Sequence, residues 1–204
     1  MTNTEMKANE IIPNEVNSDT SINIYDNDSL MEYLDAVDYC AVHRQSKVIQ
    51  NKGNDHALVV FMSIFKEAKE NIYLYAENLD NSVTRSLGYL DSLQLFLKRK
   101  GTTLNVILSN WQEENLNAPV FDLFRKYKDK VTINDGMKIP HLLLKSNGEK
   151  INFCTADGSM YRFEYDIKER SARCNFNDGD FSMHLNGIFE QLRNKKEIQP
   201  IVIS

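Results

Sequence analysis

The sequence predicts a single α/β domain whose mixed, mostly parallel sheet is flanked by helices. The first observation is that short apolar runs alternate with amphipathic helical stretches between residues 55 and 134. This order is typical of parallel strands covered by helices. The second observation is a change of rhythm after residue 140, where strand-like runs follow one another across turns and predict antiparallel pairing. A chain of 204 residues can bury one substantial core.

The composition fits a globular protein and narrows the class of function. Hydrophobic residues make up 42% of the chain and the net charge is −5, which disfavours coating of nucleic acid by bulk positive charge. The three cysteines lack a CxxC pair, so we expect Cys40, Cys154 and Cys174 to be buried thiols and no metal site to form. The sequence also lacks a Walker loop, a dinucleotide-binding glycine turn, a nucleophile elbow and a zinc-protease helix, so no cofactor is expected.

Residues 1–27 differ from the rest of the chain because they are rich in Asn, Ser, Thr and acidic residues. Such a segment buries too little apolar area to offset its ordering entropy, so we expect a flexible tail that could recruit a partner, followed by a domain over residues 28–204. The N-terminus lacks the apolar core of a signal peptide, and the most apolar run, residues 57–65, is far shorter than the roughly 20 residues of a membrane helix. We therefore expect a cytoplasmic protein, and the many Asn, Lys and Ile residues suggest a bacterial source.

The first ordered elements are expected to be a helix, a strand and a second helix. Ser29 opens a Ser-Leu-Met-Glu capping-box pattern, after which apolar residues recur at helical spacing. A strand is expected near residues 47–50, and Gly53 interrupts it. Asp55 is expected to cap the second helix, which should run to about residue 70.

Strands and helices alternate in the next stretch, which is expected to form the parallel part of the sheet. In order, we expect strand 71–76, helix 82–100, strand 103–108, helix 120–128 and strand 131–134. Gly101 lies where a helix C-cap is expected.

Turn residues dominate the pattern of the last third of the chain. Asn147-Gly148 predicts a hairpin turn between strands 141–145 and 150–155, because both residue types tolerate the positive φ angles of such turns. Two further strands and a closing amphipathic helix are expected at residues 160–165, 172–177 and 181–193.

A histidine followed later by Gly-Ser in this last third carries a resemblance to a known family. From about residue 55 to 195 the chain resembles one lobe of the phospholipase D-like superfamily, including an early I-x-L-x-A strand at residues 72–76. The family signature is His-x-Lys, four residues, Asp, six residues, then Gly-Ser-x-x-Asn. The resemblance places the histidine at His141 and the Gly-Ser pair at Gly158 and Ser159.

Three other signature positions hold different residues in this chain. The lysine position falls on Leu143, the aspartate position on Gly148 and the asparagine position on Arg162. In that family one histidine attacks a phosphodiester and a histidine from the partner lobe protonates the leaving group, while lysine and asparagine hold the phosphate oxygens. Loss of one such donor commonly raises the barrier by about 2.7–4 kcal/mol.

The resemblance therefore implies a catalytically degenerate lobe that acts as a binding or assembly module. Its ligand would carry a phosphate, as a nucleotide or nucleic acid does, or would be a protein partner in a bacterial system. Because the family builds its site across two lobes and this chain holds one, the resemblance also implies a homodimer. The alternative is an active, metal-independent phosphodiesterase or nuclease that pairs two copies of His141, with Ser159 as the other catalytic candidate.

Two cations could contact a phosphate if the site binds one. Arg162 occupies the asparagine position and can bind phosphate in a bidentate way. Lys145 lies about 13 Å beyond His141 along an extended strand at roughly 3.3 Å per residue, so its side chain would have to fold back. Alternatively, His141 is a structural residue and both cations are solvated.

Polar residues follow two of the expected parallel strands. Glu77 and Asn78 come after the first, and Ser109 and Asn110 after the second. Because α/β sheets bind ligands beyond the carboxyl ends of their strands, we expect these four residues to line a binding crevice. Asn78 and Asn110 could instead cap the following helices. Trp111 could stack on a base, or pack half-buried against a neighbouring helix.

Overall fold

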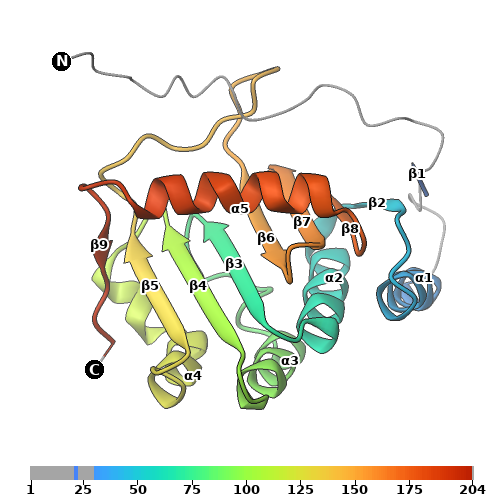
Figure 1. Cartoon of the computed structure of the whole chain (residues 1–204), viewed down its shortest axis with the longest axis horizontal. Coiled ribbons are helices and arrows are strands. Elements are labelled where there is room, and N and C mark those ends of the chain that lie inside the picture. Colours follow the sequence, from blue (N-terminus) through green and yellow to red (C-terminus); the bar gives the residue numbers. More distant parts are fainter. Residues whose placement is uncertain (1–20, 23–29, 204) are drawn as a thin grey trace.

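A computed structural model describes residues 21–22 and 30–203 of the chain, and over them it shows one sheet with helices on both faces (Figure 1). In the described residues the sheet has nine strands in the order β1-β2-β8-β7-β6-β3-β4-β5-β9. The strands are β1 (Ser21–Ile22), β2 (Val48–Asn51), β3 (Asn71–Ala76), β4 (Thr103–Leu108), β5 (Val131–Asp135), β6 (Asn152–Ala156), β7 (Met160–Asp166), β8 (Ser171–Asn175) and β9 (Gln199–Pro200). The helices are α1 (Leu30–Val42), α2 (Gly53–Glu67), α3 (Leu87–Lys98), α4 (Pro119–Lys126) and α5 (Gly179–Arg193), with a 3-10 turn at Glu113–Asn117.

The sheet has two parts, which we call the parallel block and the antiparallel block. The parallel block is β3, β4 and β5, whose pairings are parallel and which are connected through α3 and α4. The antiparallel block is β6, β7 and β8, which follow one another across tight turns. Apart from the parallel block, only the short β1–β2 ladder is parallel among the described pairings. The predicted mixed sheet is confirmed, but antiparallel pairing has a larger share than the sequence suggests.

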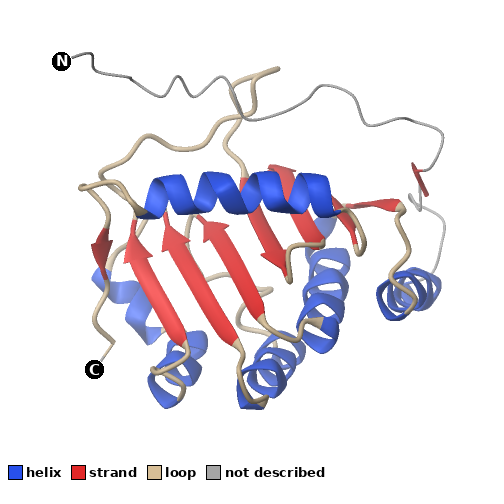
Figure 2. Cartoon of the chain, viewed as in Figure 1, coloured by secondary structure: helices blue, strands red, loops and turns tan. Residues whose placement is uncertain are grey.

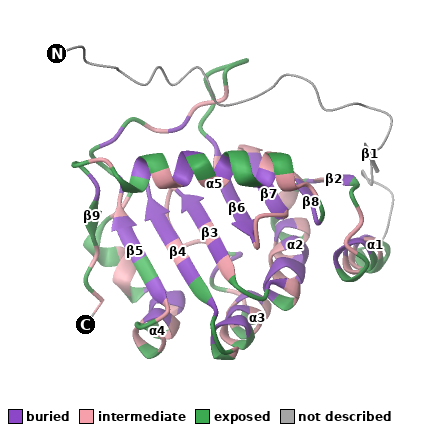
Figure 3. Ribbon diagram, viewed as in Figure 1, coloured by how far each residue is buried: buried purple, intermediate pink, exposed green. Residues whose placement is uncertain are grey.

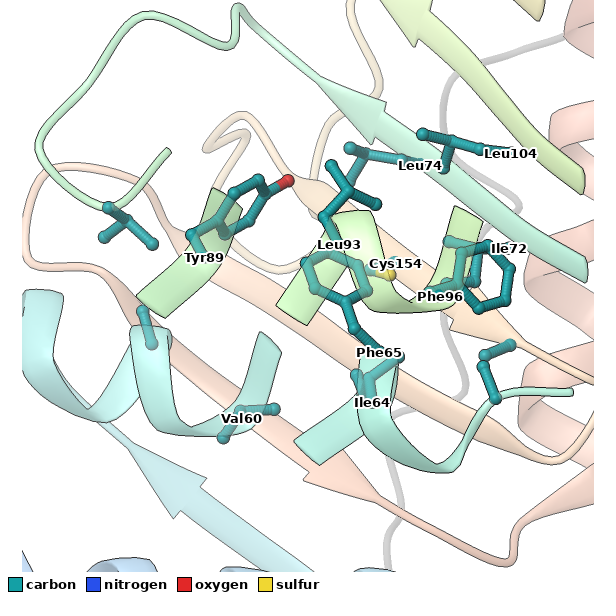
Figure 4. Close-up of a cluster of buried hydrophobic side chains, with 14 of the residues drawn as sticks. Val60, Ile64, Phe65, Ile72, Leu74, Tyr89, Leu93, Phe96, Leu104 and Cys154 are labelled. Carbon is teal, nitrogen blue, oxygen red and sulfur yellow. The ribbon is translucent and has the colours of Figure 1, made fainter. Parts of the chain in front are cut away.

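Two apolar clusters hold the layers together, one on each face of the sheet. The larger lies between the sheet and α1 to α4, and the smaller lies between the sheet and α5. Figure 3 shows the strands of the sheet as mostly buried, with exposed residues along the outer sides of the helices. The close-up in Figure 4 shows Phe65 and Ile64 of α2, Phe96 and Leu93 of α3, and Ile72 of β3 converging in the larger cluster.

Most of the predicted elements are confirmed. Strands 71–76 and 103–108 have the predicted bounds, and β2, α4, β5, β6, β7, β8 and α5 lie within two residues of prediction. The three cysteines are buried free thiols, as expected. The Ser29 cap lies outside the described residues, as does all of the 1–27 tail except residues 21–22. No helix of the described chain is long and apolar enough to cross a membrane.

Two predicted helix starts are wrong. Asp55 does not cap α2, because the helix already begins at Gly53 and Asp55 lies in its first turn. The helix expected from residue 82 begins at Leu87 instead. Asn81 Oδ1 accepts the backbone N–H groups of Val83 and Thr84, which holds this stretch in a turn, and the helix starts only after Ser86, whose side chain accepts the N–H of Tyr89.

The predicted hairpin turn at Asn147-Gly148 is confirmed, because Gly148 has a positive φ of 71° and the N–H groups of Leu144 and Ile151 donate to Glu149 and Leu142 across the turn. The strand expected at residues 141–145 does not join the sheet, because it lies in the 136–151 loop (Figure 2) and makes only one bridge, between Leu143 and Lys150, among the described residues. Both edges of β6 are already occupied, by β3 on one side and β7 on the other. Residues 141–145 therefore find no free edge of the sheet and pair only with residues 149–151, just before β6. The hairpin within the sheet is β6–β7, with its turn at Gly158.

Candidate functional site

A chain of polar side chains runs from solvent into the domain where β3 ends and β6 begins. Lys150 Nζ lies 2.8 Å from Glu77 Oε1. The backbone N–H of Glu77 donates to Asn152 Oδ1 at 3.1 Å, and Asn152 Nδ2 donates to Glu164 Oε2 at 2.7 Å. Asn152 and Glu164 are opposite each other in the β6–β7 ladder, which fixes this last contact. The chain thus links an accessible ion pair to a buried carboxylate.

Glu164 is the centre of a buried charged cluster. Its Oε1 accepts a hydrogen bond from Arg162 Nη2 at 3.0 Å, and Arg170 Nη1 lies 3.6 Å from the same oxygen. The side chains of Arg162 and Glu164 are only 3% and 2% exposed. Two guanidinium groups therefore face one carboxylate, and the net charge of the three side chains is positive.

Strand alternation places this cluster on the face of the sheet that packs against α2. Arg162 and Glu164 are two residues apart on β7, so they share the face that packs against α2. The Arg162 guanidinium lies over the ring of Phe61 at 5.2 Å from its centroid. Cys154 and Cys174 lie on either side of Arg162 in the ladder, and burial raises the pKa of each thiol to about 12. The cysteines of this face are therefore neutral at physiological pH.

A cavity of about 40 Å³ opens beside the cluster. Its polar lining comes from Arg162, Glu164, Arg170 and Asn152 of the antiparallel block, together with residues of the β3–α3 loop. Arg162 Nε is buried and has no hydrogen-bond partner within the described structure. A buried donor without an acceptor is costly, so an oxygen of a bound ligand could accept a hydrogen bond from this N–H group.

His141 lies in the 136–151 loop next to the outer ion pair. Partial burial is the main cause that lowers the pKa of His141, Lys150 lowers it further, and Glu77 opposes the shift. The lowered pKa favours the neutral form of the imidazole. The loop is held at Leu142, whose backbone N–H donates to the hydroxyl of buried Tyr75 at 3.2 Å.

Ser159 lies at the other end of the antiparallel block. Together with Gly158 it forms the β6–β7 turn, where the carboxylate of Asp157 accepts three backbone N–H groups at the start of β3, those of Lys69, Glu70 and Asn71, at 2.8 to 3.1 Å. The length of β6 therefore separates Ser159 from the 136–151 loop that holds His141, roughly 13 Å at 3.3 Å per residue. The structure does not bring His141 and Ser159 together.

The four polar residues after β3 and β4 do share one edge of the sheet. The backbone N–H of Ser109 donates to Ala76, and that of Asn110 donates to Glu77. Asn78 Oδ1 accepts the N–H of Asp80 at 3.1 Å, so part of this side chain stabilises its own turn. Ser109 is buried, and the side chain of Asn110 is exposed.

The remaining candidates lie away from the cluster. Lys145 is exposed in the 136–151 loop. Trp111 is half-buried against Phe121, with ring centroids 5.7 Å apart, which matches the packing alternative for this residue. Within the described residues, no group of three or more His, Cys, Asp or Glu side chains could hold a metal ion.

Four residues of the polar chain and the charged cluster were not among the sequence-based candidates: Lys150, Asn152, Glu164 and Arg170. A signal for one of them, Glu164, was present. β7 reads Met-Tyr-Arg-Phe-Glu-Tyr-Asp, so charges alternate with large aromatics in a strand between two other strands. In this sheet helices cover both faces, so two opposite charges two residues apart on β7 lie on one buried face and are expected to pair there. Arg170 lies in the turn between β7 and β8, where an arginine is usually solvated and gives no signal of a buried partner.

Comparison with known proteins supports the fold. Neither a protein-family model nor a curated protein matches the sequence. Among solved structures, the phospholipase D family member Nuc from Salmonella typhimurium is similar with a TM-score of 0.53 and 12% identity, over 76% of this chain and 97% of Nuc. The archaeal chromatin protein TrmBL2, whose structure shows a novel mode of DNA binding, is similar with a TM-score of 0.53 and 15% identity, over 82% of this chain and 59% of TrmBL2. The chain therefore has a phospholipase D-like fold, as its sequence resemblance implies.

Proposed function

We propose that this domain does not hydrolyse phosphodiesters and instead serves as a binding module for a phosphate-bearing ligand. The observation that carries the proposal is the separation of His141 from Ser159 by the length of β6. Acyl or phosphoryl transfer by a histidine needs stabilising groups within hydrogen-bond reach of the reacting centre. Ser159 cannot supply one, and Lys150, the cation that influences the pKa of His141, is already paired with Glu77.

The ligand-binding part of the proposal rests on the charge of the buried cluster. Arg162 and Arg170 outnumber Glu164, and cations of this type bind phosphate oxygens in a bidentate way. The cluster lies at the carboxyl edge of β3 and β4, the position where α/β sheets commonly bind ligands. One of the similar structures is that of a chromatin protein with a novel mode of DNA binding, which is consistent with a ligand that carries phosphate.

A hydrolysis assay tests the non-catalytic part. Purified protein is incubated with a generic phosphodiester and with plasmid DNA in EDTA, and no turnover is expected. Turnover that vanishes in His141→Ala, but persists when the exposed histidine of α5 is removed by His184→Ala, would instead support the active, metal-independent phosphodiesterase. Both variants are first checked by thermal unfolding, so that a folding defect is not read as lost activity.

The oligomeric state belongs to the same proposal. Two copies paired through their carboxyl edges would form the two-lobed arrangement that the resemblance implies, with an isologous interface. Sedimentation equilibrium should then give twice the 23.6 kDa of one chain. A monomer at micromolar concentration would remove the homodimer from the proposal, and capture of a specific protein by that monomer would favour an assembly role in a bacterial cytoplasm.

A further inference from the structure

We infer that the cavity beside Glu164 receives a single terminal phosphoryl group, that of a phosphomonoester or of free phosphate, and not the internal diester of a nucleic acid backbone. The inference rests on the proposed function and specifies its ligand. It is argued from the hydrogen-bonding groups of the cavity lining, from their charge and from the size of the cavity.

Two asparagine side chains of the lining use their oxygen atoms within their own turns, so only their amide N–H groups are left to bind a ligand. Asn78 Oδ1 accepts the N–H of Asp80, and Asn81 Oδ1 accepts those of Val83 and Thr84. The amide nitrogens of Asn78 and Asn81, both lining residues, therefore remain as donors. A donor-rich wall favours a ligand that carries only acceptors, as a phosphoryl group does.

The charged side chains of the lining also favour a phosphoryl group. Arg162 is 3% exposed, lines the cavity and leaves its Nε without a partner in the described chain. Arg170 lies at an ion-pair distance of 3.6 Å from Glu164, beyond a normal hydrogen bond, so its donors are not saturated by that carboxylate. A phosphoryl oxygen could satisfy both guanidinium groups and neutralise the excess positive charge.

The size of the cavity favours a terminal phosphoryl group over a diester. A volume of about 40 Å³ has room for about three water molecules at 10–15 Å³ each, which corresponds to the three terminal oxygens of one phosphoryl group. A diester carries two substituents that must both leave the cavity. Apolar side chains of Phe61, Leu79 and Tyr89 form other parts of the wall, so we expect space for only one substituent to leave.

Calorimetric titration of the full chain in phosphate-free buffer tests the inference with three probes. They are inorganic phosphate, a nucleoside 5′-monophosphate and a dinucleoside monophosphate whose only phosphate is internal. We expect the first two to bind, and the internal diester to bind at least tenfold more weakly. Arg170→Gln should weaken phosphate binding by about tenfold, since a hydrogen bond to a charged group commonly contributes this much.

Lys168→Gln is the matched control, because it removes the same charge two residues away on an exposed side chain outside the lining. It should leave phosphate affinity within about twofold. Glu164→Gln keeps the size of the side chain and removes the internal counter-charge, so a folded variant should bind phosphate more tightly than the parent.

The outcomes separate the inference from the proposed function. If the internal diester binds as well as the monophosphate, or if Lys168→Gln and Arg170→Gln lose affinity equally, the terminal-phosphoryl inference is overturned while a phosphate-binding module stands. If none of the three probes binds, both the inference and the phosphate-binding proposal are overturned.

Discussion

The two blocks of the sheet are both buried, but they are stabilised in different ways. The parallel block places apolar side chains on the larger core, where Leu74, Val106 and Ile133 meet α2, α3 and α4. The antiparallel block places Arg162 and Glu164 on that same face of the same sheet. Apolar burial is non-directional and tolerates small shifts, whereas a buried ion pair requires each partner in place. The comparison shows that a buried strand of this sheet can carry charged side chains when oppositely charged and hydrogen-bonding side chains contact them.

Breaking the buried pair should give the largest effect. Arg162→Met leaves the Glu164 carboxylate buried without its closest cation, and we expect the free energy of unfolding to fall by about 3–5 kcal/mol. Urea unfolding measures this loss. The double variant Arg162→Met/Glu164→Leu removes both charges and should recover much of the loss. A single variant that loses less than about 1 kcal/mol would show that the antiparallel block does not depend on the pair.

Removing the carboxylate that joins the two blocks should have the next largest effect. Asp157 in the β6–β7 turn accepts three backbone N–H groups at the start of β3. We expect Asp157→Ala to cost about 2 kcal/mol, because hydrogen bonds to a charged acceptor are stronger than neutral ones. Asp157→Asn keeps an acceptor oxygen and tolerates the positive φ of 52° at this position, so it should cost less. Equal losses for the two variants would contradict this account.

A smaller loss is expected at the cap of α3, beside the parallel block. The Ser86 side chain accepts the N–H of Tyr89, and Ser86→Ala removes this acceptor. The expected cost is about 1 kcal/mol, measured in the same urea series. Ser86→Thr, which retains a capping oxygen, serves as the control and should stay close to the parent.

The pH dependence of stability should be the mildest of these effects. Burial is the main cause that lowers the pKa of His56 and of His141 below the usual 6.5, opposed by Asp55 in the first case and by Glu77 in the second. The unfolded chain therefore binds these protons at a higher pH than the folded chain. The free energy of unfolding should be constant above about pH 6.5 and fall as the pH drops below it, until the folded-state pKa is passed.

Urea unfolding from pH 7 to pH 5 measures this slope. His56→Gln and His141→Gln should each flatten it. A slope that neither substitution changes would contradict the assignment of the pH dependence to these two histidines.

Prediction from the sequence succeeded where a local pattern decides the structure. The apolar runs at 71–76 and 103–108 became β3 and β4 with the predicted bounds, because strands buried on both faces need a continuous apolar run. The apolar stripe of α5 and the burial of the three cysteines were also predicted correctly, because apolar side chains and thiols favour the interior. The resemblance to the phospholipase D-like superfamily supplied the fold that the similar structures confirm.

The site was predicted less completely, because it depends on which segments meet. Glu77, Asn78 and Arg162 do contribute to one polar cluster, but Ser159 lies at the far end of β6 and Lys145 in an exposed loop. Residues 141–145 form the predicted hairpin turn with residues 149–151 but do not extend it into the sheet, because both edges of β6 are occupied. Asn152 and Arg170 carry no local pattern that marks them as partners of Glu164.

The sequence by itself thus determined the class of fold, the positions of most strands and helices, and the absence of the usual lysine from its family position at Leu143. Only the tertiary structure decided that Glu164 sits between two arginines, that Asn152 links it to Glu77, and that His141 and Ser159 lie apart. Hydrophobic periodicity is a property of neighbours along the chain, so the sequence records it directly. A charged cluster is a property of neighbours in space, and strand order and register bring them together.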